Sequence, residues 1–213
     1  MSRLFKLDNT TLSIKGNAAG FLNGITSNGL EAPLNAFLNQ HGRIIAVVRQ
    51  EKISDDEFLL SVPKVALDNL YKHWERYVRL SHVTIIPSVI NVFINMDTGQ
   101  IIWSSQDQGS HVSEEEFTLY RLDHQIPLMG IDFKAEEFIL NVHEYDYVSY
   151  TKGCYLGQEP VAKVHNRAQP SRRLIVGFED QCSLDEAAKM TSKVFDSQRQ
   201  KYRGFVFVNN KSQ

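Results

Sequence analysis

Short apolar runs separated by turn residues are the feature that most constrains the fold of this chain. Residues 44–48 and 58–62 form two such runs, and Ser54, Asp55 and Asp56 between them favour a turn, so this part predicts a β-hairpin. Several other runs are rich in β-branched residues, which are typical of strands. The predicted strands are residues 12–14, 44–48, 58–62, 83–86, 89–94, 101–103, 117–122, 174–178, 193–195 and 205–208.

Apolar residues with helical spacing lie between several of these strands. Residues 18–25 carry theirs at i, i+3, i+4 and i+7, which is one face of a helix. The same periodicity predicts helices over residues 67–80 and 135–142. Pro160 suits the first turn of a further helix.

Hairpins mixed with crossing helices indicate an α+β fold of mixed antiparallel sheets with packed helices. The stretch from Arg167 to Arg172 is the best candidate for an internal boundary. We therefore expect a main region of residues 1–170 and a shortened C-terminal β portion of residues 171–213.

The charge balance excludes one class of partner. The chain has 23 Lys and Arg against 25 Asp and Glu, a net charge of −2, so it lacks the broad basic surface of proteins that bind nucleic acid non-specifically. We expect no stable nucleic-acid complex. No run approaches the roughly 18 apolar residues of a membrane span, and the start does not resemble a secretory signal. We expect no membrane association and a cytoplasmic location.

The cysteines and histidines do not indicate a metal centre. Cys154 and Cys182 are too few for a disulfide framework or for the four ligands of a stable iron–sulfur cluster. His41, His143 and His165 are not at zinc-site spacing from them. We expect no bound metal, and a transient ligation by Cys154 stays open.

Residues 151–159, TKGCYLGQE, concentrate reactive chemistry in nine positions. A thiol close to a lysine and to a helix N-terminus has its thiolate favoured by both charges, which makes Cys154 and Lys152 candidate catalytic residues. Gln158 and Glu159 would lie at the entrance of the helix predicted at Pro160, where free N–H groups suit an anion or a polar heterocycle. The alternative is a loop that buries the cysteine as a small apolar residue.

Residues 152–159, KGCYLGQE, resemble the K-G-C-[FY]-x-G-Q-E signature of the YgfZ proteins, relatives of the glycine-cleavage T-protein (aminomethyltransferase, GcvT). Three further segments resemble that family in the expected order, and together the matches span roughly residues 8–178. They are FLNGITSN at 21–28, GRIIA at 42–46 and YRLDHQIPLMG at 120–130.

The resemblance implies a GcvT/YgfZ-like fold that binds tetrahydrofolate in a central cavity. It also implies a role in the assembly or repair of iron–sulfur proteins and in the tRNA modification that depends on them, with Cys154 as the residue tied to this activity. The pterin-binding carboxylate corresponds to Asp123, and Arg121, two residues earlier on the predicted strand, would face the same side. The implied partners are folate and iron–sulfur client or assembly proteins. The implied cofactor-binding residues are Asn28, Arg121, Asp123, Tyr155, Gln158 and Glu159.

Two departures from the family pattern leave alternatives. The T-protein carboxylate that assists one-carbon transfer corresponds to Ala46 and Val47, so aminomethyl transfer would lack its acid–base group. A folate-dependent transferase would need another carboxylate, such as Glu159. The shortened C-terminal portion also fits a non-enzymatic interaction module that has lost folate.

Overall fold

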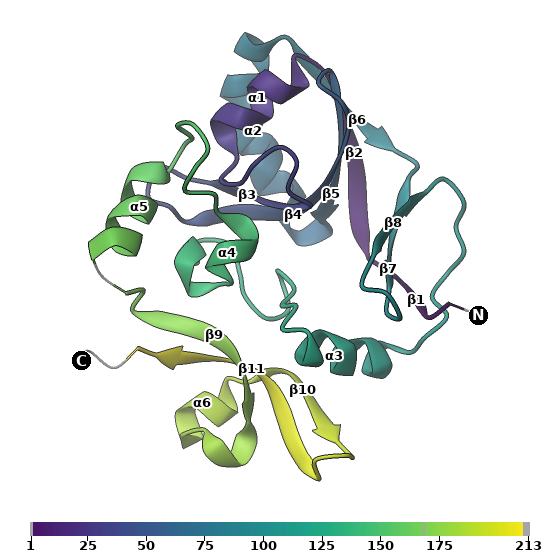
Figure 1. Cartoon of the computed structure of the whole chain (residues 1–213), viewed down its shortest axis with the longest axis vertical. Helices are drawn as coiled ribbons and strands as arrows, with labels where there is room; N and C mark the ends of the chain where they lie inside the picture. Colours follow the sequence, from purple (N-terminus) through teal and green to yellow (C-terminus); the bar gives the residue numbers. More distant parts are fainter. Residues whose placement is uncertain (1, 168, 211–213) are drawn as a thin grey trace.

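The computed structural model describes residues 2–167 and 169–210. It has the predicted α+β class, with antiparallel sheets and packed helices (Figure 1). The strands are β1 (Leu4–Lys6), β2 (Asn9–Gly16), β3 (Leu34–Leu38), β4 (Ile44–Ser54), β5 (Glu57–Pro63), β6 (Val83–Ser88), β7 (Asn91–Asn95), β8 (Ile101–Ser104), β9 (Arg172–Phe178), β10 (Thr191–Asp196) and β11 (Lys201–Asn209). The helices are α1 (Ala18–Ile25), α2 (Leu67–Ser81), α3 (Glu114–Asp123), α4 (Glu144–Tyr147), α5 (Gln158–Arg167) and α6 (Leu184–Ala188).

A five-stranded antiparallel sheet in the order β3-β4-β5-β2-β6 carries the main core. The predicted β4–β5 hairpin is confirmed, with Gln50 opposite Leu60. Leu12 of β2 pairs with the same Leu60, and α1 and α2 pack their apolar faces on the sheet (Figure 1). Trp74 of α2 is 1% exposed, as expected for a core residue.

The sequence did not reveal strand β3, because a buried asparagine interrupts its apolar pattern. Asn35 is fully buried and its amide group bonds to the Asn28 and Gly29 carbonyls and, at 3.1 Å, to Gln50 Oε1. These hydrogen bonds offset the cost of burying the amide.

The strand predicted over residues 117–122 is wrong, since these residues belong to α3. Ser113 caps this helix in a capping box with Glu116. Phe117, Tyr120 and Arg121 share a buried helical face, and the charge of Arg121 hides the helical period in the sequence. Alongside α3, β1-β7-β8 form a small sheet with its own apolar cluster, in which Phe5 stacks on Phe117.

The helix predicted over residues 135–142 is also wrong. Glu136 has a left-handed φ of 66°, and only Ile139–Asn141 form a 3-10 turn. The backbone of this segment instead bonds to the edge of β4, with Ile44 N donating to Glu137 O at 2.8 Å. Its apolar residues therefore complete the core as an extended chain.

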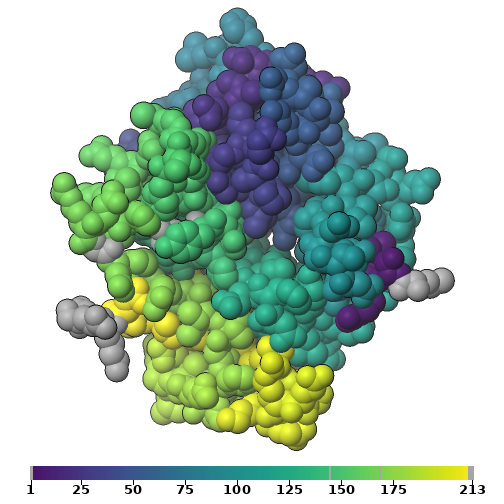
Figure 2. All heavy atoms as spheres, viewed as in Figure 1, coloured from purple at the N-terminus to yellow at the C-terminus, as the bar shows by residue number. Residues whose placement is uncertain are grey.

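The C-terminal sheet, in the order β10-β11-β9, forms the lower end of the molecule in Figure 2. Its three strands confirm those predicted after residue 172, and the short helix α6 was not predicted. Leu174 and Phe205 belong to the same hydrophobic core as the main sheet. Among the described residues, no helix is both long and apolar enough to span a bilayer.

Candidate functional site

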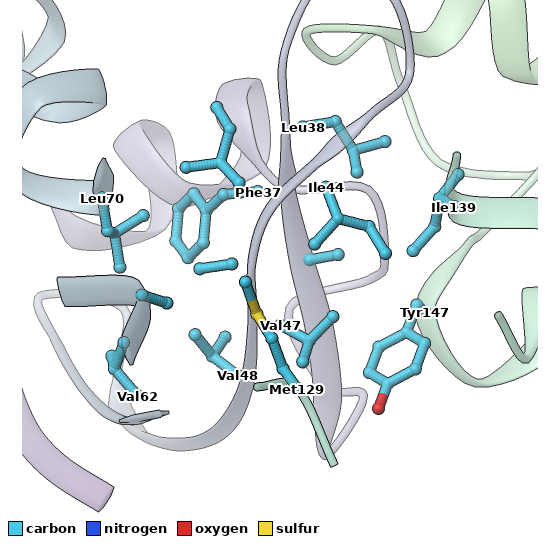
Figure 3. Close-up of a cluster of buried hydrophobic side chains, with 14 of the residues drawn as sticks. Phe37, Leu38, Ile44, Val47, Val48, Val62, Leu70, Met129, Ile139 and Tyr147 are labelled. Atoms are coloured by element: carbon cyan, nitrogen blue, oxygen red, sulfur yellow. The ribbon is translucent and has the colours of Figure 1, made fainter. Parts of the chain in front are cut away.

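A cavity of about 620 Å³ lies between the main sheet, β1, α3 and the loop that follows α3. This volume is within the range of small-molecule sites. Val47 and Val48 of β4 and Met129 of the loop supply apolar wall, and Figure 3 shows them beside Tyr147 of α4. In the same view the Tyr147 hydroxyl points away from Ile139.

Tyr147 brings a buried phenol to the cavity. The residue is 6% exposed, and burial raises the pKa of its hydroxyl to about 12. The hydroxyl is therefore protonated near neutral pH and is available as a donor to a ligand.

Arg49 is the unusual charge in the cavity. It alternates with Val47 along β4, so both side chains reach the same wall. Burial lowers the pKa of its guanidinium, and its Nε is buried with no hydrogen-bond partner among the described residues. No carboxylate of the described chain forms an ion pair with it. The residue as a whole is only partly buried, so its guanidinium can meet an acceptor or a negative charge on a ligand in the cavity.

The other cations of the cavity are already compensated. Lys64 pairs with Asp8, and Lys6 lies 2.5 Å from the Asp107 carboxylate. Arg121, which also lines the cavity, holds Asp132 at 2.6 Å.

Arg121 and Asp123 do not face one side of a strand, because they lie on helix α3. The Arg121 side chain is 3% exposed and reaches Asp132 and the Ser192 hydroxyl. The Asp123 carboxylate is 47% exposed, lies 2.9 Å from Arg203, and is outside the cavity lining. Of the predicted cofactor-binding residues, Arg121 lines the cavity, and the pterin role of Asp123 stays a prediction.

The signature segment packs against the end of α1 instead of lining the cavity. Lys152 Nζ donates to the carbonyls of Thr26 at 2.6 Å and Asn28 at 2.9 Å, and lies 5.4 Å from the ring centre of Tyr155. Burial lowers the pKa of Lys152 to about 8 and raises that of Tyr155 to about 12. The structure therefore brings Lys152, Tyr155 and the Asn28 backbone together as a structural contact.

One of the two glycines of the signature, Gly157, has a structural reason. Gly157 has a φ of 84°, and a Cβ there would lie 2.4 Å from the Asn39 carbonyl oxygen. Only glycine allows this close approach of the segment to the loop after β3.

Among the described contacts of the Lys152 ammonium, none is with Cys154, Gln158 or Glu159. The cysteine is exposed, and no described hydrogen bond joins its sulfur to Lys152. The helix predicted at Pro160 is confirmed as α5, which begins with Gln158 and Glu159. Neither residue lines the cavity, and nor does Cys154. The only support for their predicted roles is their position in the signature.

Sequence reasoning missed Arg49 and Tyr147. A signal for Arg49 was present, because a charged residue directly follows the apolar run of residues 44–48 and shares a strand face with Val47. Tyr147 lies in an aromatic-rich stretch with no clear period. Within residues 2–167 and 169–210, no group of three or more His, Cys, Asp or Glu side chains could hold a metal ion.

Comparison with known proteins identifies the architecture. No protein-family model matches the chain. The structure is similar to that of the glycine cleavage system aminomethyltransferase T from Bartonella henselae, with a TM-score of 0.69 over 97% of this chain and 78% of the other. The chain has the GcvT fold. At 11% identity the similarity shows the fold alone. Within this GcvT fold, the cavity beside Arg49 is the candidate functional site.

Proposed function

We propose that the 620 Å³ cavity binds a reduced folate, and that the protein is a YgfZ-type factor that assists iron–sulfur assembly or repair and the dependent tRNA modification. The observation that carries the folate proposal is the Arg49 guanidinium, which forms no ion pair with the described residues, in a cavity that also has apolar wall. A folate offers a flat heterocycle for the apolar walls and carboxylates for a cation. The GcvT fold and the KGCYLGQE signature support the same class of ligand.

The residues of β4 argue against the transferase alternative. Ala46 is fully buried and Val47 contributes apolar wall where the T-protein pattern has a carboxylate. Glu159, the substitute considered from the sequence, is exposed at the start of α5 and does not line the cavity. A general acid or base must reach the reacting group, so we favour ligand binding without aminomethyl transfer.

The finer role rests on Cys154. Its thiol is exposed, and solvent exposure is needed for a thiol that contacts a client protein or a cluster. We expect Cys154→Ser to fold as wild type and to fail in complementing a strain that lacks its YgfZ protein. Cys182→Ser is the matched control and should complement. Full rescue by Cys154→Ser would exclude the thiol role and leave folate binding as the proposed function.

Titration with tetrahydrofolate tests the binding proposal. A ligand specific to the native state raises the free energy of unfolding by about 2.7 kcal/mol at one hundred times its Kd. We expect saturable binding by calorimetry and a matching rise in Tm. If tetrahydrofolate produces neither, the chain is the interaction module that has lost folate.

Arg49→Met separates stability from binding. We expect a free energy of unfolding that is unchanged or higher by about 1 kcal/mol, since a partly buried cation without an ion pair among the described residues is removed. We expect the affinity for tetrahydrofolate to fall at least tenfold. Arg43→Met is the control, because Arg43 is exposed directly before β4, donates to the Glu136 carbonyl and does not line the cavity. Wild-type affinity in Arg49→Met would contradict the proposal.

A further inference from the structure

The Arg49 guanidinium comes from the inner wall of its cavity. In the register of the sheet Arg49 is opposite Leu34 of β3 and Ser61 of β5, and all three residues line the cavity. Opposite residues of neighbouring strands point to the same face of a sheet, so the guanidinium starts between two other strands. Its Nε is sealed from solvent, but the two Nη nitrogens are not among the sealed atoms that lack a partner. No described hydrogen bond uses them, so a ligand in the cavity can accept from both.

The Tyr147 hydroxyl is a second free donor on the same cavity (Figure 3). Most of the residue is buried, but the hydroxyl oxygen is not among the sealed atoms, and no described hydrogen bond uses it. Burial raises the pKa of this phenol, and the positive charge of Arg49 acts in the opposite direction. The two side chains are therefore within electrostatic reach of each other and offer a ligand N–H and O–H donors together.

The acidic side chains of the described lining lie at the exposed rim. They are Asp8 and Glu114, and both are exposed. Asp8 pairs with Lys64, whereas Glu114, the first residue of α3, forms no ion pair with the described residues. The cavity thus has free donors on its inner wall and a free carboxylate acceptor at its rim.

The rim also carries apolar side chains. Val65 and Ile131 line the cavity and are 63% and 56% exposed. The loop after α3 lies close against Val65, since a Cβ at Gly130 would be 2.8 Å from Val65 Cγ1. A flat ring placed on these side chains would remove apolar surface from water.

We propose that a reduced folate enters this cavity with its glutamate end first, so that Arg49 and Tyr147 bind a glutamate carboxylate and the pterin ring stays at the rim. The inference rests on the proposed function and names the part of the ligand that each region binds. A carboxylate accepts parallel bonds from a guanidinium and a further bond from the phenol. The amino group and ring N–H of the pterin need an acceptor, which Glu114 supplies, while Val65 and Ile131 contact the ring.

A neutral analogue tests the inner end. Calorimetric titration of the full chain compares tetrahydrofolate with its bis-amide, in which both glutamate carboxylates are carboxamides. We expect the wild type to bind tetrahydrofolate at least tenfold more tightly than the bis-amide. Arg49→Met should bind the two ligands with affinities within threefold of each other, because the charge that distinguishes them is gone.

Tyr147→Phe removes the second donor and keeps the ring that packs in the core. We expect it to reduce the preference for tetrahydrofolate over the bis-amide at least threefold. Tyr120→Phe is the matched control, because Tyr120 is also buried but does not line the cavity, and it should keep the wild-type preference. This pair of variants carries the test if Arg49→Met fails to fold.

Glu114→Gln tests the outer end. We expect it to weaken tetrahydrofolate and the bis-amide equally, by at least fivefold, since the two ligands share the same ring. Glu115→Gln should leave both affinities unchanged, because Glu115 is adjacent and exposed but outside the lining.

Two outcomes would overturn the orientation and leave folate binding in place. They are equal binding of tetrahydrofolate and the bis-amide by the wild type, and a preference for tetrahydrofolate that persists in Arg49→Met.

Titration with N-(4-aminobenzoyl)-L-glutamate, the carboxylate end alone, separates these failures from failure of the proposed function. If this fragment binds in an Arg49-dependent way and tetrahydrofolate does not bind, the carboxylate subsite stands and the folate function fails. If neither ligand binds, both proposals fail.

Discussion

Lys152 is a charged residue whose ammonium is used to hold two parts of the backbone together. Its bonds to the carbonyls of Thr26 and Asn28 join the signature segment to the end of α1. The sequence placed Lys152 beside Cys154 and suggested a catalytic pair, because adjacency in the chain is all that the sequence shows. The direction of the lysine side chain depends on a tertiary contact with residues more than a hundred positions earlier.

The half-buried ammonium of Lys152 makes the free energy of unfolding depend on pH. Burial lowers the pKa of Lys152 to about 8 in the folded protein, below the usual value of 10.5. Between these values the unfolded chain binds more protons, so stability rises with pH. Relative to Lys152→Met, we expect the free energy of unfolding of the wild type to increase by about 1–2 kcal/mol between pH 7 and pH 10. Urea denaturation of both proteins at each pH measures this, and a constant difference would contradict it.

Asp123 gives a second test at this scale. Its carboxylate pairs with Arg203 at 2.9 Å and is half exposed. We expect Asp123→Ala to lower the free energy of unfolding by about 1 kcal/mol, since Arg203 keeps Asp196 as a partner. Denaturation and tetrahydrofolate titration are measured together. A loss of folate binding without a loss of stability would instead support the pterin role predicted from the sequence.

At the scale of elements, regular apolar patterns were predictable and interrupted ones were not. The helices α1 and α2 have regular apolar faces, and the hairpin strands β4 and β5 begin with the apolar runs of residues 44–48 and 58–60, so these elements are visible in the sequence. The face of α3 contains Arg121, and β3 contains Asn35, both buried through polar partners that lie elsewhere in the chain. A polar residue in a buried position breaks the period, and its partner is known only once the fold is known.

The capping boxes of α3 and α6 allow a matched comparison. Ser113 and Ser183 each accept from the backbone N–H three residues later, but α3 buries Phe117 and Arg121 whereas α6 has no buried residue. We expect Ser113→Ala to lower the free energy of unfolding by about 1 kcal/mol. Ser183→Ala should cost less than half as much, since local fraying of α6 exposes little core. Equal losses in thermal or urea denaturation would show that burial does not govern the effect of the cap.

At the scale of the whole molecule, Asp132 connects the main region to the C-terminal β portion, which we predicted from the sequence to be separate. The carboxylate accepts from Arg121 at 2.6 Å, from the Leu128 backbone at 2.8 Å, and from the hydroxyls of Thr191 and Ser192 on β10. The division predicted at residue 171 lies next to the start of β9 at Arg172, and this buried polar network connects the chain on either side of it. The four acceptor contacts come from three parts of the chain, so sequence spacing could not reveal them.

Removing this carboxylate should affect the entire fold. Asp132→Ala leaves the Arg121 guanidinium buried without its ion pair, and we expect a loss of about 3 kcal/mol or more. Arg121→Met combined with Asp132→Leu removes both charges and should recover part of that loss. Urea denaturation measures the stability, and amide exchange reports whether β9, β10 and β11 open with the rest. A small effect of Asp132→Ala would mean that the network contributes little.

Ser192 connects the C-terminal sheet to the cavity beside Arg49. Its hydroxyl donates to Asp132 and its side chain forms part of the cavity wall. The last sheet therefore contributes part of the wall of the cavity. A protein that ended before β9 would keep the KGCYLGQE signature, but its cavity would lack this part of the wall and would be exposed to water there.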